Sequence, residues 1–471
     1  MRASHIIARA TAVLTLAAAT AAPAQEAPRP LGEVLDKYVR MSLESNLGLR
    51  TQTLEVERSL AALDAARGRF LPALALDARY TRADGGREIE LPVSSLVNPI
   101  HGTLNELLAA QGQPPRFAPI EDQSFPLQRE REQDTRLTLR QPLYAPAIPA
   151  AVNAQRSLLE GAQFARIAVA RRLKRDVTVS YLDWLRASKT VDIVESSATL
   201  LRENLRVNES LFRNGKITQD QVLRARAELL EVEQQVREAQ NLRDQARSFV
   251  NFLLNRPLET PLTPAEMGGE VSRATADLAT LRAAALANRP EIEQSERGVR
   301  AAQSQVRIER ADLKPTVSLG VDGGIQGEEY EFGRGRNFSM VSLLLNWQFF
   351  DGGTNRAQVR GARAAARQAE VRRDEVVQQI QLEVQQALDR LTTTSDSLAT
   401  AEARAEAARA GFRIASRKRD EGVINQVEFI DARSALTGAE LNLNVTVFNL
   451  LARQAELDYA TVAGKLPLPE V

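Results

Sequence analysis

The chain has 471 residues, 44% of them hydrophobic, which is enough for several ordinary domains or for one large repetitive one. Its formal charge of +1 lacks the basic excess with which proteins bind nucleic acid, so we expect no nucleic-acid partner. It contains no cysteine and two histidines, His5 and His101, which excludes disulfides, Cys/His zinc sites and Ser-His-Asp triads. We therefore expect no catalytic residues, no metal site and no cofactor.

Residues 1–24 have the pattern of a secretory signal peptide. Arg2 and Arg9 precede the apolar stretch ATAVLTLAAATAA, and the small-x-small sequence APA stands directly before Gln25. The stretch is shorter than the roughly 20 residues that a membrane-spanning helix needs. The chain after it contains no apolar run long enough to span a membrane. Any membrane contact of the mature chain should therefore use strands or an amphipathic surface.

The rest of the chain contains an internal repeat. SNLGLRTQTLEVERSLAALDAARGRFLPALAL resembles NRPEIEQSERGVRAAQSQVRIERADLKPTVSL, and each helical pattern stops at a proline, Pro72 or Pro315. Downstream, LTLRQPLYAPA resembles LLLNWQFFDGG, and NGKITQDQVLRARAEL resembles EGVINQVEFIDARSAL. Because three blocks recur in the same order, we predict a first structural repeat over 25–255, a linker over 256–277 and a second repeat over 278–471.

Each repeat is expected to run helix, strand, loop, strand, long helix, turn, helix. The long helices, 147–214 and 354–421, are rich in good helix formers and would each be about 100 Å long. Shorter helices are expected over residues 31–69, 219–255, 278–314 and 426–464. Two short helices end to end match one long helix, which predicts an elongated antiparallel helical rod.

Four short segments alternate apolar and polar side chains: residues 73–82, 135–143, 316–325 and 338–349. Such segments are typical of membrane β-barrel strands, and a soluble hairpin packed on the helices is the alternative. Four strands cannot close a membrane barrel and lipid does not tolerate open edges, so a membrane location requires several copies. The insertion at 84–134 is expected to be a tolerated surface loop with His101 exposed to solvent, and a capping loop or phage-facing surface is the alternative.

The duplicated helix-strand-strand-helix order, the junctions QPLYAPA and QFFDGG, and the Gly-x-Ile turns at Gly215 and Gly422 resemble the TolC-like outer membrane efflux proteins. The resemblance covers essentially the whole mature chain. It implies a mainly α fold with a small β part: a long antiparallel α-helical barrel plus four strands contributed to a shared trimeric transmembrane β-barrel. It also implies a homotrimer in the cell outer membrane that contacts lipid, extends into the periplasm, and docks onto a periplasmic adaptor protein and an inner-membrane RND, ABC or MFS transporter.

The two turns contain the candidate functional residues. A long helix is expected to end at a left-handed glycine in each turn, and Thr218 or Asn425 should cap the next helix, with Gln221 or Glu428 completing a capping box. The resemblance implies that these turns form a periplasmic tip on which the adaptor docks. The turn residues concerned are Gly215, Ile217, Gly422 and Ile424.

Glu428 and Asp431 share one face of the returning helix. The resemblance implies that they line the pore constriction, where three copies would form a cation-selecting ring of carboxylates. Capping alone would explain Glu428, and a solvated helix face would explain Asp431. In the first repeat Arg224 stands at the position of Asp431 and is a candidate tip latch through an acidic neighbour. The family's tyrosine before the second glycine is Arg419 here, so its closing network cannot be carried over.

The sequence therefore predicts a passive exit duct of a tripartite efflux or secretion system, which carries substrates from an inner-membrane pump across the periplasm and outer membrane. The alternative is an exported coiled-coil periplasmic adaptor or scaffold without a barrel. A carboxylate-based hydrolase is disfavoured because the acidic residues lie along helical faces, without the Gly-rich loops that would form a pocket. We expect no enzyme.

Overall fold

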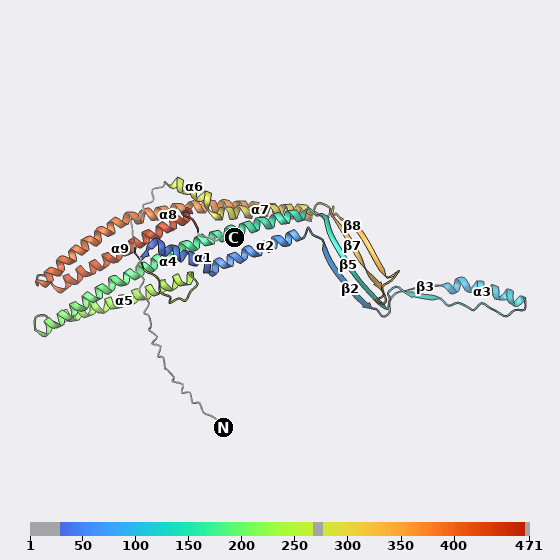
Figure 1. Cartoon of the computed structure of the whole chain (residues 1–471), viewed down its shortest axis with the longest axis horizontal. Helices are drawn as coiled ribbons and strands as arrows, with labels where there is room; N and C mark the ends of the chain where they lie inside the picture. The colour runs from blue at the N-terminus through green and yellow to red at the C-terminus, as the bar shows by residue number, and fades with distance from the viewer. Residues whose placement is uncertain (1–28, 267–276, 467–471) are drawn as a thin grey trace, which may run out of the picture. The chain divides into compact units, whose positions relative to one another are not determined.

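The computed structural model describes residues 29–266 and 277–466 (Figure 1). The predicted signal peptide and part of the predicted linker therefore lie outside the described residues. The helices are α1 Leu31–Ser45, α2 Leu47–Gly68, α3 Val93–Ala110, α4 Ala147–Arg213, α5 Gln219–Leu253, α6 Leu278–Asn288, α7 Pro290–Ala311, α8 Thr354–Asp420 and α9 Gln426–Ala460. The strands are β1 Arg29–Pro30, β2 Ala73–Arg82, β3 Glu88–Leu91, β4 Gln123–Pro126, β5 Arg131–Tyr144, β6 Ala265–Glu266, β7 Thr316–Gly327 and β8 Asn337–Asn346.

The chain divides into two compact units, and each draws on both halves of the sequence. The first unit takes its described residues from Met1–Thr51, Ile167–Arg289 and Gln379–Val471, and the second from Gln52–Arg166 and Pro290–Gln378. The long helices α4 and α8 contribute to both units. Because the units do not coincide with the two predicted repeats, the repeat boundaries stay a prediction.

The lengths of the helices follow the duplication in the sequence. Helices α4 and α8 have 67 residues each, and the returning helices α5 and α9 have 35 each. All four begin at the residue expected from the sequence, and their ends lie within a few residues of the expected positions. Long runs without proline and with strong helix formers are the most reliable helical signal.

Two helices that the sequence predicts as continuous are each broken in the structure. The predicted helix 31–69 is interrupted at Asn46, which has extended backbone angles; its side chain accepts a hydrogen bond from Leu49 N–H at 3.1 Å and so caps α2. The predicted helix 278–314 is interrupted at Arg289, because the proline that follows disfavours helical angles in the preceding residue. Both predictions of one helix were wrong, and the breaks fall at matching positions of the repeat.

The first unit has an apolar core that also holds the linker. Tyr38, Val177 and Tyr181 are almost fully buried in a cluster built from α1, α4 and α5. The hydroxyl of Tyr181 donates to the carbonyl of Thr263 at 2.7 Å, and the N–H of Thr263 donates to the hydroxyl of Tyr38 at 2.8 Å. Hydrogen bonds with two buried tyrosines therefore hold the described part of the linker against the helices.

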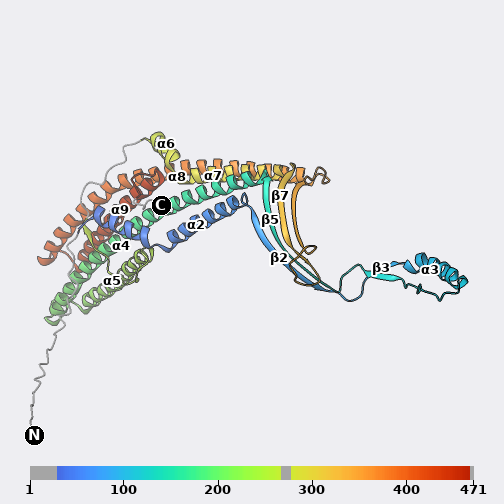
Figure 2. The same cartoon turned by 45° about the vertical axis from the view of Figure 1, so that its right-hand side comes forward.

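The second unit contains an antiparallel sheet with the strand order β2-β5-β7-β8, drawn as one curved layer in Figure 2. These four strands include or overlap the predicted segments. In the register of the sheet Leu74 lies opposite Leu139, and Val321 lies opposite both Leu139 and Val341, so one face is a row of apolar side chains. Much of this face is open, as at Leu76, 69% exposed, and Leu343, 70% exposed.

Strands β2 and β8 form the two edges of this sheet. Within the described residues each has a single neighbour, β5 or β7, so the outer backbone edge of each strand carries no strand partner. Unpaired N–H and C=O groups along a strand edge are a template for pairing with another chain. The sheet therefore has two unpaired edges and an uncovered apolar face.

The insertion between β2 and β5 is folded, whereas the sequence predicted a loop. It contains the hairpin β3–β4 and helix α3. Asn98 and Asn105 bind the backbone of the returning segment on both sides: Asn98 pairs with Ile120 at 2.8 and 2.9 Å, and Asn105 donates to the carbonyl of Phe117 at 2.7 Å. His101 is partly exposed, and its ring donates to the carbonyl of Ala118 at 2.9 Å.

No helix in the described parts of the chain is both long enough and apolar enough to cross a membrane.

Candidate functional site

The two predicted turns have the same backbone geometry. Gly215 and Gly422 have φ angles of 69° and 73°, in the left-handed region that favours glycine. The N–H of Gly215 donates to the carbonyl of Phe212 at 2.9 Å, and that of Lys216 reaches Leu211 at 2.9 Å; Gly422 and Val423 make the equivalent pair. This is the Schellman motif, which satisfies the last carbonyls of a helix. A Cβ at either glycine would meet no atom within 4 Å, so backbone conformation alone requires glycine there.

The two returning helices begin differently. Asn425 caps α9 as predicted, accepting the N–H of Glu428 at 2.9 Å, and its amide donates to the Glu428 carboxylate at 3.1 Å. Thr218 makes no side-chain cap on α5, because its hydroxyl donates to the carboxylate of Asp220 instead. The predicted cap by Thr218 was therefore wrong, because an acidic side chain two residues later competes for the hydroxyl.

One of the two candidate constriction residues, Asp431, lies close enough to an acidic residue of the other hairpin to affect its pKa. Glu428 and Asp431 are exposed on α9. Burial raises the pKa of Glu228 on α5, and the negative charges of Glu231 and Asp431 raise it further. Asp431 therefore acts electrostatically across the two hairpins, on a carboxyl group that the sequence analysis did not single out.

Arg224, the candidate latch, is exposed on α5. Its charge helps to lower the pKa of Asp220, one turn earlier, although the hydrogen bond from Thr218 is the larger cause. Within the described residues no ion pair joins Arg224 to the second hairpin. Its role as a latch stays a prediction.

Arg419 forms contacts between the two hairpins that could not be predicted from the sequence. Its guanidinium donates to the side-chain oxygen of Asn204 on α4 at 3.3 Å and to Asp420 at 2.9 Å. The same group lies 4.0 Å from the ring centre of Phe429, which is buried on α9. A cation over an aromatic face contributes about 0.5–2 kcal/mol. Arg419 thus connects three helices next to the second turn.

Arg433 is a second arginine in this interface, and it is buried. Its Nε donates to the hydroxyl of Ser197 on α4 at 3.3 Å, and its guanidinium lies 5.4 Å from the ring of Phe412 on α8. Burial lowers the pKa of Arg433. The sequence did hold a sign that Arg433 is buried. It lies four residues after Phe429, on the buried face of α9, where an apolar residue would be expected.

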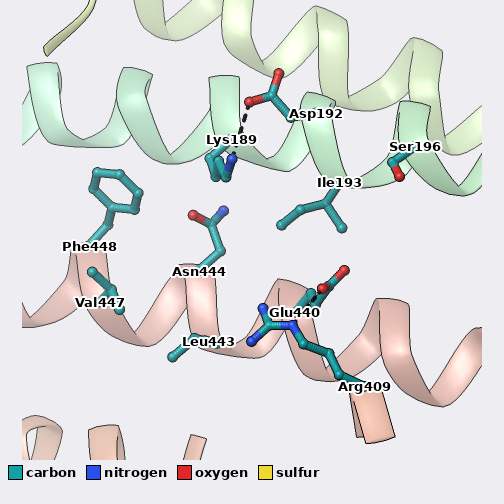
Figure 3. A pocket seen from close by; sticks show the side chains of 10 residues that line it. All are labelled: Lys189, Asp192, Ile193, Ser196, Arg409, Glu440, Leu443, Asn444, Val447 and Phe448. Carbon is teal, nitrogen blue, oxygen red and sulfur yellow. Dashed lines mark hydrogen bonds and ion pairs between the residues drawn. The ribbon is translucent and has the colours of Figure 1, made fainter. Parts of the chain in front are cut away.

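A groove of about 410 Å³ lies between α4 and α9 in the first unit, bordered also by α8 (Figure 3). Two ion pairs border it, Lys189 with Asp192 at 3.6 Å and Arg409 with Glu440 at 3.1 Å. Between them the lining is largely apolar, and the buried Asn444 donates from α9 to the carbonyl of Arg186 on α4 at 3.0 Å. The residues that line it are Lys189, Asp192, Ile193, Ser196, Arg409, Glu440, Leu443, Asn444, Val447 and Phe448.

Across the described residues, no three or more His, Asp and Glu side chains are grouped so that they could hold a metal ion.

The chain has two helical hairpins with glycine turns, and the first helix of each hairpin follows a strand of the sheet. The sheet has four strands and an uncovered apolar face. This combination is typical of outer-membrane channels with helical periplasmic parts. The outer membrane efflux protein family matches residues 38–256 and 281–461, and the chain belongs to this family. It is an outer membrane protein that extends into the periplasm, as the sequence predicted. The alkaline protease secretion protein AprF of Pseudomonas aeruginosa is 23% identical over 287 residues, which are 60% of this chain and 60% of AprF.

Solved structures share the fold over almost the whole chain. The outer-membrane channel OprN is 21% identical, with a TM-score of 0.74 over 92% of this chain and 90% of OprN. The CmeC outer membrane channel of Campylobacter jejuni is 16% identical, with a TM-score of 0.77 over 93% of this chain and 87% of CmeC. The MtrE channel of Neisseria gonorrhoeae is 19% identical, with a TM-score of 0.72 over 92% of this chain and 90% of MtrE. These similarities confirm the predicted fold class.

Proposed function

We propose that this chain is the outer-membrane exit duct of a tripartite efflux or secretion system, and that three copies form one passive channel. The observation that carries the proposal is the sheet, which combines two unpaired edges with an uncovered apolar face. In lipid the unpaired strand edges must pair with strands of further copies. The apolar face would then be covered by the lipid acyl chains. Three copies are the number implied by the resemblance to the TolC-like proteins.

The tip of the duct is proposed to close at the two returning helices. Glu428 and Asp431 would form the constriction, supported by their exposure in the single chain and by the effect of Asp431 on Glu228. Crowded carboxylates favour bound cations or protons, because either relieves like-charge repulsion. Arg224 is proposed as a latch of the closed tip, acting beside the contacts of Arg419.

A periplasmic adaptor is proposed to dock at the turns around Gly215, Ile217, Gly422 and Ile424. The rigid Schellman geometry of both turns supports this, since a preorganised surface loses little entropy on binding. The groove between α4 and α9 offers an apolar floor between charged borders, which suits an amphipathic helix of the adaptor. The adaptor would connect the duct to an inner-membrane transporter of the RND, ABC or MFS class.

The proposed cargo follows from the relatives. The family is named for efflux and AprF for protease secretion, so both small molecules and unfolded polypeptides are candidate substrates. The pump would supply energy and selectivity, and this chain would supply the passage. The alternative of a coiled-coil adaptor without a barrel has no support in the family match or in the uncovered apolar face of the sheet.

The test is the assembly state together with conduction. Detergent-extracted protein should have the mass of three chains in native mass spectrometry, and it should open conducting pores in planar bilayers. A chain that leaves the membrane fraction without detergent, or that conducts no ions as a trimer, would contradict the proposal.

A further inference from the structure

The segment that follows β8 exposes three aromatic side chains. Trp347, Phe349 and Phe350 are 54%, 84% and 79% exposed. Trp347 and Phe349 continue the odd-numbered positions of the apolar face of β8, after Leu343 and Leu345. The indole N–H of Trp347 donates to the carbonyl of Leu313 at 3.3 Å, which fixes the ring at the end of the sheet. Aromatic rings at the end of an apolar strand face are typical of the membrane–water interface.

Helix α8 then begins with a stripe of arginines. Arg356, Arg360, Arg363 and Arg367 are spaced by four, three and four residues, which places them on one side of the helix over about 16 Å. All four are exposed. None of them forms an ion pair or side-chain hydrogen bond with any residue the structure describes. By contrast Arg373, further along α8, is paired with Asp374 at 2.7 Å.

We propose that these aromatic and arginine residues form a binding patch for anionic phospholipid headgroups in the inner leaflet of the outer membrane. Along the chain an apolar strand face is followed by aromatic rings and then by guanidinium groups, which matches the order of acyl chains, interface and phosphates in a leaflet. Guanidinium binds phosphate through two parallel hydrogen bonds. The patch relies on the outer membrane location of the family and on the helices extending into the periplasm.

A neighbouring copy would offer few free carboxylates to these arginines. Strands β8 and β2 are the sheet edges, so α8, which follows β8, would border the α2 helix of the next copy. On α2, Glu55 and Asp64 are already paired with Arg58 and Arg67 at 2.5 and 3.1 Å, whereas Glu57 is exposed and forms no ion pair with any residue the structure describes. One free carboxylate cannot balance four arginines, so lipid phosphates are the better match for most of the stripe.

Trp347 reports directly on this patch, since the chain has two tryptophans. In a Trp184→Phe background, the detergent-purified oligomer is reconstituted into phosphatidylcholine vesicles that contain either brominated phosphatidylglycerol or brominated phosphatidylcholine, whose bromine atoms quench tryptophan fluorescence. We expect the brominated phosphatidylglycerol to quench Trp347 with an apparent affinity about fivefold higher. The preference should shrink at high salt, which screens the interaction. Equal quenching by both lipids, or no quenching by either, would overturn the proposal.

Substitutions test whether these particular arginines, rather than positive charge elsewhere on the protein, give the preference for the anionic lipid. Arg356→Gln with Arg360→Gln should abolish the lipid preference, because these arginines lie nearest to the aromatic rings, and Arg363→Gln with Arg367→Gln should reduce it less. Lysine at 356 and 360 should keep most of it, since the charge remains. Arg206→Gln is the matched control, because Arg206 is exposed but paired with Glu203 at 2.6 Å. A preference that persists in the 356 and 360 glutamine variant, with the oligomer intact, would exclude the patch.

Discussion

At the scale of single residues, we expect Glu228 to make the stability of the helical hairpins depend on pH. Its pKa is raised above the ordinary 4.5 by burial and by Glu231 and Asp431, so the folded protein holds this proton at pH values where the unfolded chain has lost it. Stability therefore falls as pH rises from 4.5 through the folded pKa. We expect Glu228→Gln to raise the midpoint of thermal unfolding at neutral pH and to make no difference below pH 4.5.

The control for this prediction is Glu203, whose pKa is shifted in the opposite direction. A hydrogen bond from Arg206 lowers the pKa of Glu203, so its contribution is present above pH 4.5 and is lost as pH falls through the lowered value. Glu203→Gln should therefore lower the thermal midpoint at neutral pH and change little in acid. Identical pH profiles for the Glu228 and Glu203 variants would show that the shifts do not govern stability.

Asp431 and Glu428 differ in what they do locally, and a conductance measurement can separate them. Asn425 caps α9 through the backbone N–H of Glu428, and a glutamine at 428 keeps an oxygen for the Asn425 amide. In reconstituted bilayers, Asp431→Ala should weaken cation selectivity and block by multivalent cations. Glu428→Gln should weaken them less if capping is its main task. Unchanged selectivity in Asp431→Ala would leave Asp431 as an ordinary solvated side chain.

At the scale of elements, the two glycine turns can be tested by conformation alone. Gly215→Val and Gly422→Val should each destabilise the turn by about 1–2 kcal/mol, because a β-branched residue resists the left-handed angles although no atom blocks it. Adaptor binding, measured with the purified adaptor, should weaken while the oligomer persists. Gly411→Ala, inside α8, is the control and should stabilise by about 0.5–1 kcal/mol. Normal adaptor binding by both valine variants would remove the turns from the docking surface.

The two faces of strand β2 offer a matched pair of substitutions. Leu76 is on the apolar face and the adjacent Ala75 is on the polar face, and both are exposed in the single chain. Leu76→Arg should reduce the amount of protein inserted in the outer membrane, at a cost of about 2–4 kcal/mol for a midplane charge. Ala75→Arg should insert normally. Membrane fractionation measures both, and equal losses would contradict the assignment of the faces.

The elements show which parts of the fold are readable from sequence. Alternating strands and long helices without proline beyond the first turn are local patterns, and the structure confirms them. The interruption at Asn46 has a local and a long-range part. Its side-chain oxygen caps α2 at Leu49, and asparagine is a common N-cap that the sequence analysis did not use, whereas its amide donates to the carbonyl of Leu253, 207 residues away, which no local pattern shows. The interruption at Arg289 was announced by Pro290, which the sequence analysis did not use.

The candidate site also has parts that can be predicted from the sequence and parts that cannot. The turns are predictable because a left-handed residue after a long helix is usually glycine. The contacts of Arg419 with Asn204 and of Arg433 with Ser197 join residues 215 and 236 positions apart. Such pairs are set by how two hairpins meet, and an arginine in a single sequence is equally compatible with a solvated helix face.

At the scale of the whole molecule, the absence of cysteine makes the assembly easy to measure. We expect strand β8 of one copy to pair with β2 of the next. A fixed Ala78→Cys in β2, combined with single cysteines placed in turn along β8, should give disulfide-linked products of up to three chains on oxidation. Either cysteine alone should give none. A series that stops at two chains, or that contains more than three, would contradict the trimer.

The folded insertion after β2 has a consequence for how this protein can evolve. Asn98, His101 and Asn105 hold the returning segment through its backbone atoms, and the side chains of that segment take no part in those bonds. Long loops of outer membrane proteins face the outside of the cell. Two side chains of the segment also hold the insertion: the carboxylate of Asp122 accepts the N–H of Ser94, and the ring of Phe117 packs on His101. Substitutions elsewhere in the segment could therefore evade bacteriophages and antibodies that recognise particular surface side chains, while the insertion keeps its shape.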